Sequence, residues 1–333
     1  MTRLTVEFVT VHLSQGRRSF RLMSQADSKM QMIDLKAYAK INLALCILGC
    51  REDGYHELRT IYQSVSLADD VEIQVSASNG PVRLESAGFE VPRGAQNLAV
   101  RAAEAIRKEL RIRRGIFLRL HKRIPPGSGL GGASSDAAAV LRGVLTLCGK
   151  TLPPERLLHL AAELGSDVPF FLIGGRALGL GRGEEVYALP ESPRRYVVIV
   201  FPGEGMSTAE AYRLLDIARD RPRLTGHGAR PTIELFCGTA MDRAVARLSN
   251  DFEPLLFRRF PGLKRAKRLL LHGGAEMASL SGSGSALFGL FRESATARRA
   301  ARELQDSGAV IVIARTISQR EFSRSASVVP SRQ

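Results

Sequence analysis

One short segment combines glycines, serines and a helix start, and these features together suit phosphate binding. Glycine lets the backbone adopt positive φ and approach a ligand closely. A helix start presents unpaired N–H groups at the positive end of the helix dipole. An alanine-rich stretch follows the segment directly. The sequence therefore predicts a phosphate-binding loop made of Pro125, Pro126, Gly127, Ser128, Gly129, Leu130, Gly131, Gly132, Ala133, Ser134 and Ser135.

Other glycine-rich nucleotide loops fit this segment less well. It matches G-x-G-x-x-G, but a dinucleotide fold needs an acidic residue about 20 residues further on. The next acid after Asp136 is Glu155, beyond a helix and two prolines. No lysine follows Gly132, as G-x-x-x-x-G-K-[ST] requires, and the protein-kinase motifs H-R-D and D-F-G are absent. If the loop binds phosphate, it must do so through backbone N–H groups and the helix dipole. Ser134 or Ser135 could then contact a metal ion or a phosphate oxygen.

Two polar residues interrupt an apolar, strand-like run at residues 37–48. Lys40 and Asn42 occupy alternate positions and therefore share one face of the expected strand. Buried together, they would need polar partners. A lysine that reaches solvent from an edge strand is the alternative interpretation.

A single aspartate, Asp167, lies between a helix end and the apolar run Pro169–Phe171. A carboxylate in apolar surroundings can act as a general base tuned by burial and a nearby cation. A turn residue or a helix cap is the alternative.

A turn dipeptide, Asp53-Gly54, marks a hairpin and is followed by two aromatic residues. The ring of Tyr55 could stack on a nucleobase, and His56 could hydrogen-bond to one. An exposed hairpin tip without a binding role is the alternative.

A second glycine loop covers residues 281–285, Ser-Gly-Ser-Gly-Ser. It could close over phosphates or form a plain hairpin turn. The sequence alone leaves both interpretations open.

Strand and helix patterns alternate along the chain and must position these residues. Strands are predicted at 37–48, 71–75, 115–124, 195–201, 277–280, 286–291 and 309–314. Helices are predicted at 97–110, with Asn97 as N-cap, and at 136–148, 154–165, 207–215, 262–272 and 297–304. Because the elements mix without a regular β-α-β repeat, we expect an α+β fold in two domains.

The chain is strongly basic, with a net charge of +15 and a pI near 10.3. Such a charge suits either a nucleic acid or an anionic substrate. Tryptophan is absent and aromatic residues make up 6%, which supplies few stacking platforms for bases. We therefore predict no nucleic-acid partner.

Features of other protein classes are missing from the sequence. No apolar run reaches the roughly 18 residues that a membrane span needs, and the first 36 residues lack a signal-peptide pattern. We expect a cytoplasmic protein without a membrane partner. The four cysteines, Cys46, Cys50, Cys148 and Cys237, form no C-x-x-C motif, which favours unpaired thiols without a metal role.

Together, these segments resemble the GHMP kinase superfamily over residues 36–316. The loop 125–135 resembles its phosphate-binding motif, and residues 279–291 resemble its C-terminal glycine motif. Five further segments match, in order, the branch that phosphorylates a cytidine-diphosphate sugar alcohol: 39–43, 51–56, 165–169, 181–184 and 202–212.

The resemblance implies a two-domain α+β GHMP kinase fold. The N-terminal domain, residues 36–190, would resemble domain 2 of ribosomal protein S5 and carry ATP binding and catalysis. The C-terminal domain, residues 191–316, would be a ferredoxin-like α/β domain. From composition alone, residues 1–35 are expected to be a poorly ordered extension, or to precede a true start at Met23, Met30 or Met32, and residues 317–333, rich in Ser and Arg, a disordered tail.

The resemblance also implies a reaction and its residues. ATP with Mg²⁺ would phosphorylate the 2-hydroxyl of the sugar alcohol in the non-mevalonate route to isoprenoid precursors. Asp167 would be the general base, and Lys40 would hold it ionised and steady the developing alkoxide. Tyr55 and His56 would recognise the cytidine, and Asn42 would bind substrate nearby. The Mg²⁺ ligands stay open because no second carboxylate stands out.

Two rival interpretations remain. A GHMP kinase acting on a small alcohol such as mevalonate or homoserine would not need Tyr55 and His56. An inactive member that binds RNA or a regulator would not need Lys40 and Asp167. The sequence allows a monomer or a homodimer.

Overall fold

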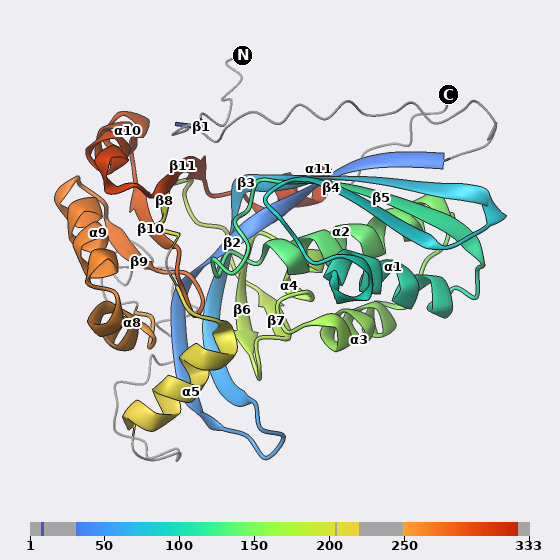
Figure 1. The fold of residues 1–333 in the computed structure, drawn as a ribbon, viewed down its shortest axis with the longest axis horizontal. Coiled ribbons are helices and arrows are strands. Elements are labelled where there is room, and N and C mark those ends of the chain that lie inside the picture. The colour runs from blue at the N-terminus through green and yellow to red at the C-terminus, as the bar shows by residue number, and fades with distance from the viewer. Residues whose placement is uncertain (1–7, 10–30, 204, 220–248, 326–333) are drawn as a thin grey trace.

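Two β-sheets, each packed against helices, form the described part of the chain (Figure 1). The computed structural model describes residues 8–9, 31–203, 205–219 and 249–325. Helices and mixed sheets in two units confirm the expected α+β class. The two sheets meet along a long hairpin that carries several of the predicted site residues.

The larger sheet has the order β4-β5-β3-β6-β7, and β2 pairs with β3. Its strands are β2 (Gln31–Cys50), β3 (His56–Asn79), β4 (Val82–Gly88), β5 (Arg114–Lys122), β6 (Arg176–Leu180) and β7 (Glu185–Ala188). β4 and β5 run parallel, and the other pairs are antiparallel. Register shifts after Tyr38 and Asn42 interrupt the β2–β3 ladder, as β-bulges do where a strand bends.

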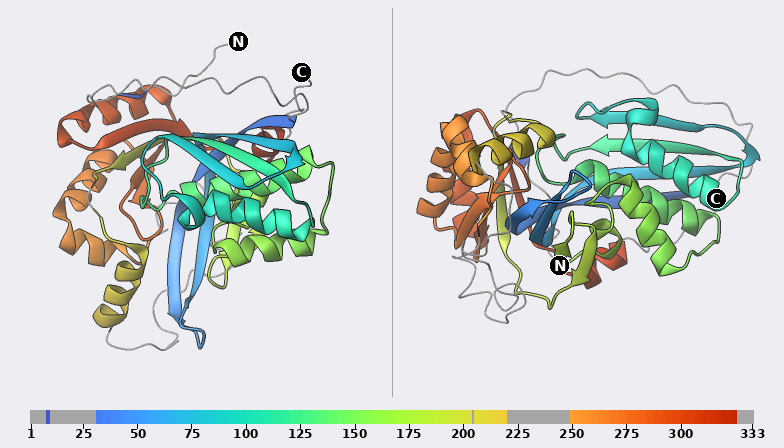
Figure 2. Two further views of the ribbon diagram at one scale, coloured as in Figure 1. Left: turned by 45° about the vertical axis from the view of Figure 1, so that its right-hand side comes forward. Right: turned by 90° about the horizontal axis from the view of Figure 1, so that it is seen from below.

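Helices cover one face of this sheet (Figure 2). They are α1 (Leu98–Glu109), α2 (Gly132–Leu147), α3 (Pro154–Leu164) and the short α4 (Phe170–Ile173), with the 3-10 turn η1 (Gly94–Gln96) before α1. The Asn97 side chain accepts the Ala99 N–H, which confirms it as the N-cap of α1. α2 is apolar on nearly every side because it lies between the sheet and the other helices.

The smaller sheet has the order β1-β11-β8-β10-β9, all antiparallel. Its strands are β1 (Phe8–Val9), β8 (Tyr196–Phe201), β9 (Met277–Leu280), β10 (Leu287–Phe291) and β11 (Val310–Arg315). The helices of this half are α5 (Thr208–Arg219), α8 (Glu253–Arg259), α9 (Pro261–His272), α10 (Ser294–Glu303) and the 3-10 turn η3 (Gln305–Ser307). α8, α9 and α10 lie on the outer side of the smaller sheet (Figure 1). The last helix, α11 (Gln319–Ser325), packs against β2 of the larger sheet.

The β2–β3 hairpin joins the two halves through a shared core. Ile41 and Ile61 of the hairpin pack in one buried cluster with Ile199 of β8 and Phe288 of β10. Each fully buried aliphatic or aromatic side chain contributes about 1.5–3 kcal/mol by leaving water. The hairpin, which belongs to the larger sheet, is thereby fixed against the smaller one, and the polar residues on it occupy the junction.

Both ends of the folded region differ from expectation. Residues 31–35 were expected in a poorly ordered extension, but they begin β2 because Ile33 and Leu35 are buried in the core. The expected disordered tail contains α11, whose Phe322 is buried and packs 5.7 Å from the ring of Tyr38. Residues 1–7, 10–30 and 326–333 lie outside the described residues.

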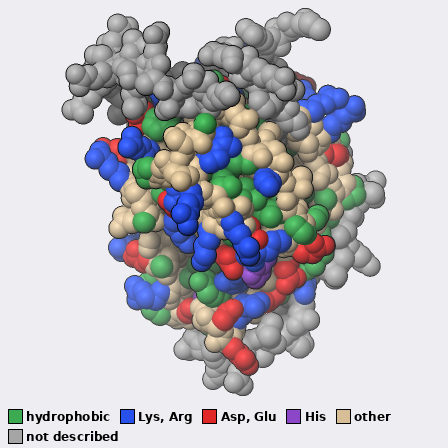
Figure 3. Space-filling model, turned by 90° about the vertical axis from the view of Figure 1, so that its right-hand side faces the viewer, with side chains coloured by type: hydrophobic (Ala, Val, Ile, Leu, Met, Phe, Trp, Pro, Cys, Tyr) green, Lys and Arg blue, Asp and Glu red, His purple; other side chains and the backbone are tan. Residues whose placement is uncertain are grey.

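Surface charge is partly paired. On the face seen in Figure 3, basic side chains are interspersed with acidic ones. Arg119 pairs with Glu72 at 2.7 Å, and Arg123 pairs with Asp70 at 2.5 Å. Among the described residues, none of the helices is both long enough and apolar enough to cross a bilayer.

Candidate active site

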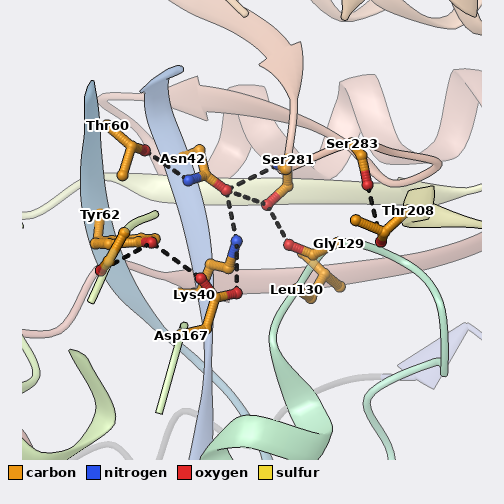
Figure 4. Close-up of polar contacts among 12 residues, drawn as sticks. Lys40, Asn42, Thr60, Tyr62, Gly129, Leu130, Asp167, Thr208, Ser281 and Ser283 are labelled. Carbon is orange, nitrogen blue, oxygen red and sulfur yellow. Dashed lines mark hydrogen bonds and ion pairs between the residues drawn. The ribbon is translucent and has the colours of Figure 1, made fainter. Parts of the chain in front are cut away.

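Lys40 and Asp167 lie together, although 127 positions separate them along the chain. The Lys40 Nζ is 3.3 Å from the Asp167 Oδ2 (Figure 4). Lys40 is almost fully buried, whereas the side chain of Asp167 is 31% exposed. The aspartate sits in the turn between α3 and α4, where the main chain reverses before Pro169. A buried cation beside an accessible carboxylate suits a base that is approached from one open side.

Asn42 is the centre of a buried polar network. Its Oδ1 accepts hydrogen bonds from the Lys40 Nζ at 2.6 Å and from the Gly282 N–H at 2.8 Å. Its Nδ2 donates to the Thr60 hydroxyl at 2.7 Å, and that hydroxyl donates to the Ala44 carbonyl. Asn42 is only 2% exposed, so it holds protein groups in place around Lys40.

The predicted phosphate loop has the backbone that phosphate binding needs. Gly127, Gly129 and Gly131 all have positive φ, between 68° and 80°. Gly131 is the N-cap of α2, and no side chain caps this helix. The N–H groups of its first turn are therefore open to an anion. The Lys40 N–H donates to the Leu130 carbonyl at 2.9 Å, which ties the loop to β2.

The two glycine loops lie against each other. The Ser281 hydroxyl donates to the Gly129 carbonyl at 2.9 Å, and the Ala286 N–H donates to the Ser128 carbonyl at 2.9 Å. The Ser283 hydroxyl bonds to the Thr208 hydroxyl at the start of α5. The second glycine loop is therefore part of the same site, packed beside Lys40 and the start of α5 (Figure 4).

The serines of the first loop differ in their surroundings. Ser128 is buried and donates to the Pro125 carbonyl at 2.6 Å, which shapes the loop. Ser135 is also buried. Ser134 is half-buried in the first turn of α2. Of the two adjacent serines, Ser134 is therefore the more exposed.

A buried ionic cluster holds both ends of the phosphate loop. Lys122 donates to Asp69 and, at 2.5 Å, to Asp136 in the first turns of α2. Asp69 also accepts the Ile124 N–H at 2.9 Å, just before the loop begins. Burial raises the pKa of Asp136 to about 8 against the opposing effect of Lys122. Sequence patterns do not reveal this cluster, because its members look like separate surface charges.

The tip of the β2–β3 hairpin brings Tyr55 and His56 beside other elements. Tyr55 is 54% exposed, and the guanidinium of Arg182 lies 4.7 Å from its ring centre. The His56 Nε2 is 2.7 Å from an oxygen of Asp216 in α5, and its ring is 4.6 Å from that of Tyr212. The hairpin tip therefore faces α5 and the turn after β6, and it offers exposed and half-buried rings to a planar ligand.

Among the described residues, no group of three or more His, Cys, Asp or Glu side chains could hold a metal ion. Cys50 and Cys148 are free thiols, and Cys237 lies outside the described residues. A cavity of about 600 Å³ lies on the larger sheet, lined by residues such as Asp34, Asp70 and Arg119. None of the predicted site residues lines it, so we assign it no part in the site.

Comparisons with known proteins agree with this geometry. Residues 97–175 match the family described as "GHMP kinases N terminal domain", and residues 229–310 match "GHMP kinases C terminal". The 4-diphosphocytidyl-2-C-methyl-D-erythritol kinase of Solibacter usitatus is 48% identical over 78% of this chain and 81% of its own length. The enzyme of the same name from Moorella thermoacetica is 41% identical over 86% of this chain and its own full length.

A solved structure is similar as well. The crystal structure of a 4-(cytidine 5'-diphospho)-2C-methyl-D-erythritol kinase superposes with a TM-score of 0.69 at 37% identity. The match covers 85% of this chain and 99% of that one. Both halves of the present fold therefore have counterparts in a single known enzyme.

Proposed function

The chain belongs to the GHMP kinases and, within them, to the family of 4-diphosphocytidyl-2-C-methyl-D-erythritol kinases, and from this premise we propose its reaction and the roles of its residues. It is an ATP-dependent small-molecule kinase of isoprenoid precursor synthesis. The proposed reaction transfers the γ-phosphoryl group of ATP to the 2-hydroxyl of 4-diphosphocytidyl-2-C-methyl-D-erythritol. The products are the 2-phosphate and ADP.

The contact between Lys40 and Asp167 beside both glycine loops is the observation that supports this reaction best. Asp167 would accept the proton of the 2-hydroxyl as the oxygen attacks the γ-phosphorus, and the bond to the ADP oxygen breaks. Lys40, at 3.3 Å, would hold the carboxylate in place and stabilise the charge on the attacking oxygen. Phosphoryl transfer needs mainly positioning and charge neutralisation, which these groups supply.

ATP would bind along the loop from Pro125 to Ser135. The uncapped start of α2 provides N–H groups and a positive dipole for the phosphates. Mg²⁺ bound with ATP would neutralise charge on the phosphates. The half-buried Ser134 is the side chain we propose nearest to it, with ATP oxygens and water as the main ligands, because no group of three or more His, Cys, Asp or Glu among the described residues could hold a metal ion.

The cytidine end would lie at the hairpin tip. Tyr55 would stack on the base, and His56 would hydrogen-bond to its edge once released from Asp216. Arg182, held against Tyr55, would meet the negative diphosphate or the base plane. Asn42, whose polar atoms bond to protein groups, would act on substrate mainly through Lys40.

Identification of the product tests the proposal. Purified protein, ATP, Mg²⁺ and the cytidyl substrate should yield a phosphate monoester on the 2-oxygen, read by ³¹P NMR and mass spectrometry. ATP cleavage without this ester, or an ester on another hydroxyl, would show that the assigned reaction is wrong.

A further inference from the structure

Tyr62 makes a direct contact with Asp167 that the sequence patterns did not reveal. Its hydroxyl donates to the Asp167 Oδ1 at 2.9 Å (Figure 4). The tyrosine is 2% exposed, and its ring packs 4.7 Å from that of Phe170, just beyond the aspartate. The Lys40 Nζ lies 5.4 Å from the centre of the same ring. One buried side chain therefore touches both members of the proposed catalytic pair.

The strands place this tyrosine on the active-site face. Tyr62 of β3 stands opposite Asn42 of β2 in the antiparallel ladder. Thr60, two residues earlier, bonds to Asn42, so both β3 residues share the face that carries Lys40 and Asn42. The position of the hydroxyl is thus set by the same ladder that sets Lys40.

Two glycines leave room for the ring. A Cβ on Gly179 would lie 2.5 Å from the Tyr62 Cε2, and a Cβ on Gly183 would lie 2.4 Å from its hydroxyl oxygen. Gly183 belongs to the turn at residues 181–184, between β6 and β7. The turn also places Arg182 against Tyr55. It therefore contacts both Tyr62, beside Asp167, and Tyr55, at the hairpin tip.

The two oxygens of Asp167 therefore have different surroundings. Oδ1 accepts the Tyr62 hydroxyl, whereas Oδ2 lies beside Lys40. We propose that Tyr62 is a positioning residue that anchors the carboxylate through Oδ1 and leaves Oδ2 to take the proton of the substrate hydroxyl. The inference rests on the proposed function, since it assumes that Asp167 is the base.

The Tyr62 hydroxyl is suited to donate a hydrogen bond and not to accept one. Burial, together with the charge of Asp167, raises the pKa of Tyr62 well above its usual value, so the hydroxyl keeps its proton. Its second acceptor, the Gly183 carbonyl, is farther away at 3.4 Å. The single proton is therefore best directed at the carboxylate.

The variant Tyr62→Phe removes the hydroxyl and keeps the ring packing. We expect its kcat to fall on the order of tenfold, because a hydrogen bond to a charged group is lost at the reacting base. Its KM values for ATP and for the cytidyl substrate should stay within about twofold, since neither binding surface changes. Tyr38→Phe, which removes a hydroxyl from β2 near α11, is the matched control and should behave as wild type.

Tyr62→Leu removes the ring as well as the hydroxyl, so its comparison with Tyr62→Phe separates the effects of the two groups. If Tyr62→Phe keeps the full wild-type kcat and Tyr62→Leu does not, only the ring matters and the proposal is overturned. A fall in kcat for Tyr62→Phe with matching rises in both KM values and a lowered melting temperature would show a packing role instead. An inactive wild-type protein would refute the proposed function itself, whereas an active wild type with an unaffected Tyr62→Phe would refute this inference alone.

Discussion

Packing between the two glycine loops gives a sharp test, because an added Cβ would clash at one glycine of the first loop and not at another. Gly127 and Gly129 have similar positive φ values, 68° and 80°. A Cβ on Gly129 would lie 2.0 Å from the Ser281 carbonyl oxygen, whereas a Cβ on Gly127 meets nothing within 4 Å. The variants Gly127→Ala and Gly129→Ala therefore share the backbone strain, and only the second carries the clash.

The expected magnitudes follow from this difference. A left-handed alanine costs about 1–2 kcal/mol, and each kcal/mol lowers the melting temperature by about 2–4 °C in a domain of this size. Gly127→Ala should therefore melt about 2–8 °C below wild type. Gly129→Ala must also separate the loops by more than about 1 Å, and a displacement of that size in an active site costs about 100-fold in rate. It should melt lower still and lose about 100-fold in kcat/KM for ATP.

Thermal unfolding of the ligand-free proteins, followed by steady-state kinetics, measures both effects. Ligand-free melting is the cleaner comparison, since no bound nucleotide contributes to it. Equal melting temperatures for the two variants, or wild-type ATP kinetics for Gly129→Ala, would refute the idea that contact between the loops builds the ATP site.

Three further substitutions test the proposed roles. Asp167→Asn should fold normally and lose about 10²–10⁴-fold in kcat, since it removes the base, and near-wild-type turnover would exclude that role. Lys40→Met should lower kcat about 100-fold or more through lost charge stabilisation, checked by pre-steady-state ADP formation; a change in the KM for ATP alone would assign Lys40 to binding instead. Tyr55→Ala should weaken binding of the cytidyl substrate about 5- to 150-fold in calorimetry, because one stacked base is worth about 1–3 kcal/mol, with ATP binding unchanged. Equal losses for both ligands would point to a folding role for Tyr55.

Local sequence patterns predicted most of the elements, and their physical causes are visible. Asn97 caps α1 as expected, since a side-chain oxygen before an apolar helix satisfies a free N–H. Sequence patterns found only residues 71–75 of β3, because the rest of that strand carries polar residues. Thr60 and Gln63 are buried there only because partners from distant segments satisfy them. Local patterning does not reveal partners that the fold supplies.

The site was predicted in part for the same reason. Lys40, Asp167 and the phosphate loop stand out as unusual residues within their own segments, and the structure brings them together. Tyr62 resembles an ordinary strand aromatic until Asp167, 105 residues away, meets its hydroxyl. Asn42, predicted to bind substrate, also contacts Gly282, 240 residues away, and so links two protein segments. Such roles depend on tertiary contacts and are not encoded in spacing.

The rate of ADP release with competing alcohols tests the central claim most directly. In a coupled assay, the purified protein with ATP and Mg²⁺ should turn over 4-diphosphocytidyl-2-C-methyl-D-erythritol, and it should release no ADP above background with mevalonate or homoserine. Turnover of mevalonate, with none of the cytidyl substrate, would contradict the account.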